Sequence, residues 1–524
     1  MSSGPVVTSV SPPASGQVTR LVAGHRGLDG IRRAVTDPFA YGAAPLLAHC
    51  LPRGSRLAAP RLLRTRYAPG RELVAYYAFA PGRNQSSPRH LALTWSIQPA
   101  DLATTGVLER EAEVRGLVEP FERLVAASAD NCLTLVIAPI DPAFPRLVRH
   151  YESGYVTATA ASLAGVRPGA DREVRALRYR PGSRHVLRVR TSAEDSTIVK
   201  LYRDDTGART VAVAAAMDAL LPAAVPGIRP ARSIGYVPAD RAAWWTEEPG
   251  EPLWRRLPDV EAGPLLRTVG RALRVLHDTD PSAFTSSLPS AYAAPSASRS
   301  ASRSASRSSS PASSPASSAH LPAHGADAEL AATTRAAEHI QGLLPRVGGR
   351  LRDVVARIGD GLAARPVESP TLTHGDLTCD NLLATGDQVR LIDLDRTGFA
   401  EPALDLGKFV ADLWWWCAEL GLPAGPAVTA FVDGYGDCDR NRLARAHGLA
   451  VLFHLSLAAR RVPVHHPEWA HQVSRAVRQA EDAVAGGGAS GGGASGGGAS
   501  GGGTARVPRQ RGPSAGESGS GELR

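Results

Sequence analysis

Apolar and polar residues alternate in two groups of short segments, which predicts two groups of β-strands. The first group comprises residues 62–67, 73–79, 91–96 and 133–138, and the second comprises 174–179, 185–190, 197–202, 234–237 and 242–246. A polar stretch with helical character, residues 107–127, precedes the last strand of the first group. The second group therefore follows a plan similar to that of the first.

After the second group, the pattern changes to the three- and four-residue spacing of helices. Helices are predicted over residues 265–277, 327–344 and 347–362, and an Ala-rich one over 210–221 connects strands of the second group. This order of elements predicts an α+β protein in which a small β-rich lobe is followed by a larger helical lobe.

Three tracts contain few large apolar residues and are predicted to be disordered. They are the N-terminus (residues 1–25), a Ser-, Ala-, Pro- and Arg-rich insertion (285–325) and a tail that opens with GGGAS repeats (484–524). The Gly- and Ser-rich tail has the composition of a flexible linker.

A short motif occurs twice, with its two copies 112 residues apart. Residues 66–71 read RYAPGR and residues 178–183 read RYRPGS. One interpretation is a diverged internal duplication. The other is a common β-turn with Pro and Gly in their favoured positions. The first copy has no lysine where the second has Lys200, so we expect chemistry in the second copy.

Charge and cysteine content narrow the range of partners. The net charge is +9, but several arginines lie in the loose tracts without interleaved aromatics, and no zinc-finger spacing occurs, so nucleic acid is not favoured as the partner. The apolar stretch 210–228 is broken by Asp218, Pro222 and Pro226, so no membrane span is predicted. Five scattered cysteines without a CxxC pair and no N-terminal signal predict a cytoplasmic protein.

Lysine is rare in this chain. Of 59 basic residues two are lysines, Lys200 and Lys408. A coding bias toward arginine explains the scarcity, yet a lysine that persists invites a functional question, because arginine does not replace a compact point charge everywhere. Lys200 lies in an apolar strand and is the stronger candidate, with a solvated strand position as the alternative. Lys408 is expected at the surface or at a helix entry.

Two short apolar runs on either side of the turn Thr385-Gly386-Asp387 predict a β-hairpin. Asp376 and Asn381 precede its first strand, and Asp393 ends its second, so the hairpin brings the three side chains together. Phosphoryl transfer uses such a set, because one carboxylate orients the attacking hydroxyl while a carboxylate and an amide oxygen hold Mg²⁺. The alternative is that the two aspartates merely cap backbone groups.

The string His374-Gly375-Asp376-x4-Asn381, followed by Ile392-Asp393, resembles the hallmark of the aminoglycoside phosphotransferase-like family of small-molecule kinases. The resemblance extends to residues 401–407, 248–253 and 276–277, and spans about 174–479. It implies a bilobal protein-kinase-like fold with an N-lobe at 156–250 and a C-lobe at 251–483. Residues 26–155 would be an extra α+β region or a diverged N-lobe duplicate.

The resemblance also implies roles for individual residues. Asp376 would be the catalytic base, Asn381 and Asp393 would bind Mg²⁺, and Lys200 would pair with the nucleotide phosphates. His374 and Asp405 would support the loop. The other nucleotide contacts would be Pro181, Gly182 and Ser183 in a turn over the phosphates, and Glu247, Glu248 and Gly250 in the connector between the lobes.

The expected activity is a Mg²⁺-dependent transfer of the γ-phosphate of ATP or GTP to a hydroxyl of a small molecule, such as an amino sugar, a sugar or an amino alcohol. The alternative is a nucleotide-binding pseudokinase or regulatory protein without turnover. The helix after Lys200 has no Glu for the usual ion pair, and Asp218 is the one acid in residues 210–221. Asp395 is either an accessory metal ligand or a partner of Arg396.

Overall fold

The computed structural model describes residues 15–55, 59–80, 88–98, 101–128, 132–165, 173–190, 196–289, 321, 325–460 and 463–487. The disorder expected for residues 1–25 is wrong from Ser15 onward, because α1 (Ser15–Val22) is a helix. Its Val18, Leu21 and Val22 follow helical spacing and are buried. The predicted insertion and tail fall mostly on residues 290–320, 322–324 and 488–524, which lie outside the described residues.

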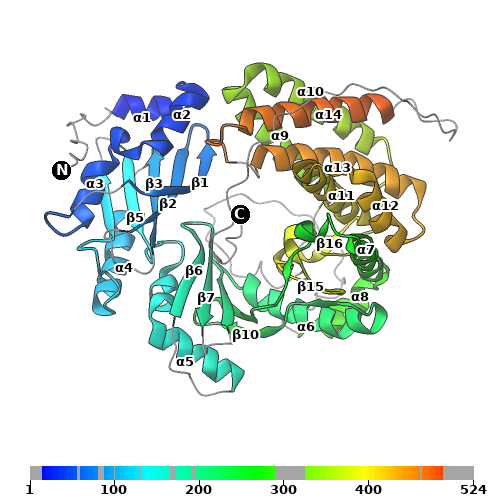
Figure 1. Cartoon of the computed structure of the whole chain (residues 1–524), viewed down its shortest axis with the longest axis horizontal. Coiled ribbons are helices and arrows are strands. Elements are labelled where there is room, and N and C mark those ends of the chain that lie inside the picture. The colour runs from blue at the N-terminus through cyan, green and yellow to red at the C-terminus, as the bar shows by residue number, and fades with distance from the viewer. Residues whose placement is uncertain are drawn as a thin grey trace, which may run out of the picture. The chain divides into compact units, whose positions relative to one another are not determined.

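The first strand group forms an antiparallel sheet with the order β1-β2-β3-β5-β4. Its strands are β1 (Arg61–Ala68), β2 (Glu72–Phe79), β3 (Arg89–Ser96), β4 (Val125–Ser128) and β5 (Leu133–Ile137). The helices that accompany this sheet are α1, α2 (Gly27–Thr36), α3 (Ala43–Cys50) and α4 (Leu102–Val114) (Figure 1). The sheet and these helices are called the N-terminal domain below, whereas α5 (Ser153–Ala164) packs against strands of the second sheet (Figure 1). All four strands predicted here are confirmed.

The helix predicted over residues 107–127 is wrong beyond Val114, where α4 ends. Gly116 follows with a φ of +67°, a conformation that favours glycine and stops a helix. Pro120 then removes a backbone donor, and Val125 begins a strand that the sequence pattern did not reveal.

The second strand group forms another antiparallel sheet, with the order β6-β7-β8-β11-β10. Its strands are β6 (Glu173–Arg180), β7 (Arg184–Arg190), β8 (Ser196–Leu201), β10 (Ser233–Val237) and β11 (Ala242–Thr246). The two sheets thus share one strand order. Each also has a helix after its third strand, α4 in the first and α6 (Thr206–Ala224) in the second. An internal duplication would produce the same strand order and the same helix position in both sheets.

Strand register identifies which positions correspond between the two sheets. Arg66 and Thr94 both lie opposite Val74 in the first sheet. In the second sheet Arg178 and Lys200 both lie opposite Val186. The first sheet therefore carries a threonine where the second carries Lys200, which leaves the lysine chemistry to the second sheet.

The two faces of the second sheet serve different purposes. Tyr179, Leu187, Val199 and Trp244 are buried in the same apolar cluster as the core of the N-terminal domain. Adjacent residues of a strand point to opposite faces, so Lys200 lies on the other face. That face meets the helical lobe, as the ion pairs of Lys200 described below show.

The helical lobe contains most of the remaining elements (Figure 1). Its helices are α7 (Ala262–Asp278), α8 (Pro281–Ser287), α9 (Ala326–Leu343), α10 (Pro345–Ala363), α11 (Pro402–Leu420), α12 (Ala424–Tyr435), α13 (Arg440–Arg460) and α14 (Trp469–Gly487). One small sheet has the order β12 (Glu251–Pro252), β14 (Leu382–Thr385), β15 (Gln388–Leu391), β9 (Ile228–Pro230), and another pairs β13 (Thr371–Thr373) with β16 (Gly398–Ala400). Short 3-10 turns are η1 (Pro38–Tyr41), η2 (Pro145–Tyr151), η3 (Leu253–Arg256), η6 (Cys379–Asn381) and η7 (Leu394–Arg396). The predicted order of a β-rich lobe before a helical lobe is confirmed.

Helix α6 is long and apolar enough, by length and composition, to cross a membrane, and no other described helix meets that test. Its Val213, Met217 and Leu221 are buried in the core of the helical lobe. A helix packed in a protein core often meets the same test, so this is weak evidence for a membrane span.

Candidate active site

The backbone of the loop that begins at His374 is held by one buried carboxylate. Asp405 at the start of α11 accepts hydrogen bonds from the amides of His374 (2.6 Å) and Gly375 (2.9 Å). Gly375 has a φ of +74°, and a Cβ there would lie 2.2 Å from the carbonyl oxygen of Arg396. Glycine is therefore required between His374 and Asp376, and Asp405 has the supporting position that the sequence predicted.

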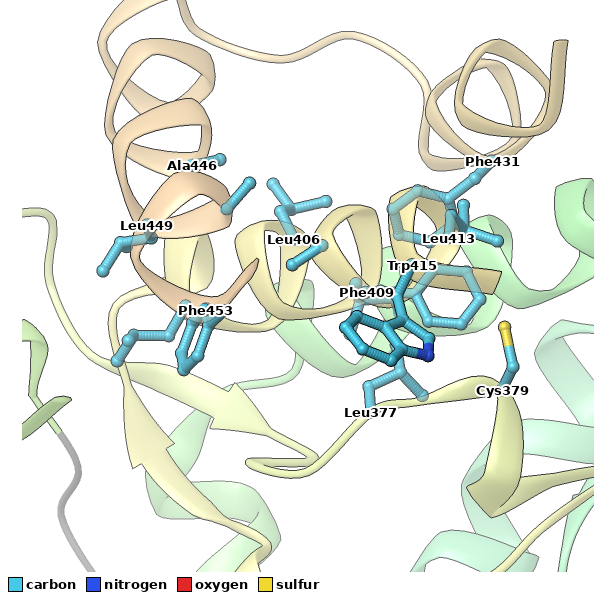
Figure 2. Packing of buried hydrophobic residues seen from close by; sticks show 14 of the residues in the cluster. Leu377, Cys379, Leu406, Phe409, Leu413, Trp415, Phe431, Ala446, Leu449 and Phe453 are labelled. Carbon is cyan, nitrogen blue, oxygen red and sulfur yellow. The ribbon is translucent and has the colours of Figure 1, made fainter. Parts of the chain in front are cut away.

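Apolar residues that follow Asp376 in sequence fix the loop to the core. Leu377 and Cys379 are buried, and Figure 2 shows them beside Phe409 and Trp415 of α11. The amide of Cys379 also donates to the buried carboxylate of Asp412 (2.7 Å). These buried side chains and the hydrogen bond to Asp412 fix the backbone of the loop, and they thereby fix the position of the Asp376 carboxylate.

The carboxylate of Asp376 is paired with Lys408 of α11, with 2.5 Å between Nζ and Oδ1. The Lys408 side chain is 14 % exposed, so the surface position expected for it is wrong. Burial acts to raise the pKa of Asp376, but the Lys408 charge and its hydrogen bond hold that pKa below the usual value. Asp376 is thus held as a carboxylate.

The hairpin β14–β15 brings Asn381 and Asp393 to this loop, and the predicted hairpin is confirmed. The side-chain amide of Asn381 donates to the backbone carbonyl of Asp376 (2.8 Å), and the backbone carbonyl of Asn381 accepts from the Ile392 amide (2.9 Å). Asp393 follows with a φ of +59°. Its charge is close enough to act on the pKa of Asp376. The three predicted side chains therefore lie together.

Lys200 lies against this group from the second sheet. Its Nζ is 2.6 Å from Oδ1 of Asp393, while Arg184 Nη1 is 3.1 Å from Oδ2. The Lys200 side chain is 11 % exposed, which excludes a solvated strand position. Burial acts to raise the pKa of Asp393, but the Lys200 and Arg184 charges hold it well below its usual range.

Asp395 completes the charge balance around Lys200. It pairs with the Lys200 ammonium and accepts hydrogen bonds from the hydroxyls of Tyr202 (2.8 Å) and Thr210 (3.3 Å). Arg396 pairs with Glu329 instead. Asp218, the acid considered for Lys200, is exposed on α6. Asp395 therefore occupies the place of the missing helix glutamate as a counter-charge.

The turn of Pro181, Gly182 and Ser183 connects β6 and β7 as predicted. Gly182 has a φ of +72°. Its amide donates to Asp141 of the N-terminal domain (2.8 Å), and the same carboxylate oxygen lies 2.6 Å from Nε2 of the buried His185. The N-terminal domain thus holds the turn through a contact that local sequence patterns do not reveal.

The connector between the lobes is held by charged contacts on both sides. Glu247 pairs with Arg188 of β7, and Glu248 pairs with Arg390 of β15. At Gly250, with a φ of +117°, a Cβ would lie 2.7 Å from the carbonyl oxygen of Ala384. The connector therefore lies tightly against the hairpin that carries the candidate site.

The donor set at the candidate site suits a hard divalent cation. Asp393 offers carboxylate oxygens, and Asn381 offers an amide oxygen that no hydrogen bond engages among the described residues. Mg²⁺ prefers oxygen ligands and keeps several waters, so two protein ligands and nucleotide phosphates fit it. Within the described ranges, no cluster of three His, Cys, Asp or Glu side chains is arranged to hold a metal by itself.

The sequence patterns did not predict the roles of three residues in this region, which are Lys408, Asp395 and Asp141. The scarcity of lysine was the signal for Lys408. Asp141 carried no signal, because its partners lie 41 and 44 residues away.

Two surface hollows lie in the N-terminal domain, around His49 and Arg123, and contain none of the predicted site residues.

These features define a class of protein. A lysine on the third strand of a β-rich lobe faces an aspartate–asparagine–aspartate set on a loop and hairpin of a helical lobe, which is the arrangement of a protein-kinase-like phosphotransferase. The chain belongs to the phosphotransferase enzyme family, whose model matches residues 176–448, just over half of the chain. The predicted family and fold are confirmed.

Several solved structures are similar to the chain at low identity. One is the GDP complex of aminoglycoside 2'-phosphotransferase-IIIa (14 % identity, 64 % of this chain and 99 % of that one, TM-score 0.41). Another is a choline/ethanolamine kinase family protein from Mesorhizobium loti (15 % identity, 63 % of this chain and 94 % of that one, TM-score 0.37). A third is macrolide 2'-phosphotransferase from Brachybacterium faecium (15 % identity, 60 % of this chain and 96 % of that one, TM-score 0.35). No curated protein sequence matches the chain.

Proposed function

We propose that this phosphotransferase is a cytoplasmic small-molecule kinase that moves the γ-phosphate of ATP or GTP to a hydroxyl of an amino sugar, a sugar or an amino alcohol, with Mg²⁺ as cofactor. The proposal rests on one observation: the side chains of Asp376, Asn381 and Asp393 lie together and face Lys200. The five cysteines all lie in the part of the chain that the structure describes and form no disulfide there, which supports the location.

Each side chain has a task in this reaction. Asp376, held as a carboxylate beside Lys408, would accept the hydrogen bond of the acceptor hydroxyl and take its proton. Lys200 and Arg184 would bind phosphate oxygens of the nucleotide. A divalent ion held by Asn381 and Asp393 would neutralise charge that develops on the phosphates.

A pseudokinase is the second candidate, supported by the missing helix glutamate. The counter-charge that Asp395 gives Lys200 weighs against it. Turnover separates the two, because a pseudokinase binds nucleotide without consuming it.

The function is tested by incubating the purified chain with ATP or GTP, Mg²⁺ and a panel of amino sugars, neutral and phosphorylated sugars, and amino alcohols. We expect nucleoside diphosphate release that requires both an acceptor and the divalent ion, and that EDTA abolishes. The phosphorylated acceptor is identified by mass spectrometry. Nucleotide binding, seen as a rise in melting temperature, without release for any acceptor would favour the pseudokinase.

Replacing Lys408 by Met is expected to lower kcat about 10- to 100-fold, because Asp376 loses the ammonium that orients it and favours its charged form. Without that ammonium, burial raises the pKa of Asp376, so the acid limb of the kcat/KM profile should move to higher pH. Lys408→Arg keeps the charge and should retain most of the pH profile. An unshifted acid limb in Lys408→Met would contradict this role.

A further inference from the structure

A group of arginines lies on the face of the second sheet that carries Lys200. Arg178 is directly opposite Val186, which is directly opposite Lys200. Arg180 is directly opposite Arg184 in the same pair of strands. Directly opposite residues and residues two apart on a strand share a face. The three arginines therefore lie on the side of Lys200, toward the loop of Asp376.

The charges of this group are only partly balanced. Arg184 and Lys200 pair with Asp393 and Asp395. Within the part of the chain that the structure describes, the side chains of Arg178 and Arg180 have no ion pair and no hydrogen bond. Both residues are partly buried. A partly buried charge without a partner is costly, and an anionic ligand removes that cost.

A fourth arginine, in the N-terminal domain, acts electrostatically on this group. Arg64 of β1 lies opposite Tyr76, is partly buried and likewise has no ion pair or hydrogen bond among the described residues. Burial, then the charges of Arg64 and Arg178, lower the pKa of Arg180 to about 9. The positive charges of Arg64, Arg178 and Arg180 therefore repel one another.

We propose that Arg64, Arg178 and Arg180 form a binding subsite for a phosphate group, and that Arg64 makes the N-terminal domain part of it. A planar guanidinium donates two parallel hydrogen bonds to a phosphate, so several arginines around one place suit this ligand. The assignment of the phosphate rests on the proposed function, since it belongs either to the nucleotide or to a phosphorylated acceptor.

The position of the subsite constrains the acceptor. Burial lowers the pKa of Arg178, and the carboxylates of Asp393, Asp380 and Asp376 act to raise it. Together with the position of Arg178 on the Lys200 face of the sheet, this places the subsite on the side of the predicted base. A polycationic amino sugar bound against this side would be repelled, whereas an anionic acceptor would be attracted. Among the acceptor classes proposed above, this favours sugars, and phosphorylated sugars in particular.

The subsite is tested by calorimetric titration of the full chain with inorganic phosphate. Arg64→Ala is expected to weaken phosphate binding about tenfold, the typical effect of one charged hydrogen-bond partner. Arg71→Ala is the matched control, because Arg71 is exposed in the β1–β2 turn of the same domain, and it should change affinity less than about twofold. Equal affinities of the two variants would overturn the proposal.

Two further measurements keep the result decisive. Melting temperatures establish that each variant is folded, and Arg180→Gln replaces Arg64→Ala if the latter is not. Arg180→Gln should weaken phosphate binding to a similar degree, and wild-type affinity in a folded Arg180→Gln would count against the subsite.

A repeat titration at saturating ADP identifies the source of the phosphate. Phosphate binding that persists and still depends on Arg64 would assign the subsite to the acceptor. Displacement of phosphate by ADP, with weaker ADP binding in Arg64→Ala, would assign it to the nucleotide. Phosphate binding that is equally strong in wild type and Arg64→Ala, with or without ADP, would refute both assignments. No step requires turnover, so failure here is distinct from failure of the kinase assay.

Discussion

Replacing Asp376 by Asn is expected to lower kcat about 10²- to 10⁴-fold, the usual range for loss of a general base. The amide has nearly the same shape as the carboxylate and keeps the apolar anchors Leu377 and Cys379 in place. It has no charge to attract the hydroxyl proton. Nucleotide affinity should stay within about twofold, since Lys200 and Arg184 are unchanged.

The measurement is steady-state turnover with the acceptor found in the screen, together with nucleotide binding by calorimetry. Asp387→Asn is the control, because Asp387 is exposed in the β14–β15 turn and the substitution changes net charge equally. Wild-type turnover in Asp376→Asn would show that another group accepts the proton. A large loss of nucleotide affinity would instead indicate a structural role.

Local patterns were sufficient to predict most of the site. The hairpin after Asn381 follows from two apolar runs around a Gly-containing turn, and it dictates that Asp393 returns to the loop of Asp376. The strand with Lys200 follows from alternation with a period of two. These features depend on residues close in sequence, and the structure confirms their placement, while their catalytic roles stay predictions.

Contacts between distant segments were beyond the sequence. Lys408 reaches Asp376 because α11 packs under the loop, and the spacing of 32 residues has no periodic signature. Asp141 reaches Gly182 only because the N-terminal domain shares a core with the second sheet. The β-strand at Val125 was missed because the preceding polar residues continued a helical pattern that Gly116 and Pro120 end.

Asp393 has two opposing effects that one substitution separates. Its carboxylate is the predicted metal ligand, yet its oxygens also engage Lys200 and Arg184, the two cations expected to bind nucleotide phosphates. Asn is the appropriate replacement, because it removes the charge, keeps the shape and tolerates the left-handed conformation at φ +59°.

In Asp393→Asn we expect loss of the ion-dependent turnover by at least about 10³-fold, comparable to removing a principal charge-stabilising group. ADP binding in the presence of EDTA should become tighter, by a few-fold to about tenfold, because no carboxylate competes with the phosphates for Lys200 and Arg184. Asp387→Asn again serves as the control and should change neither quantity. Retained turnover would remove Asp393 from the metal site. Direct competition between Asp393 and the phosphates predicts tighter ADP binding once the carboxylate is removed. Weaker ADP binding in EDTA would therefore contradict competition and show that Lys200 and Arg184 need Asp393 to hold them in position.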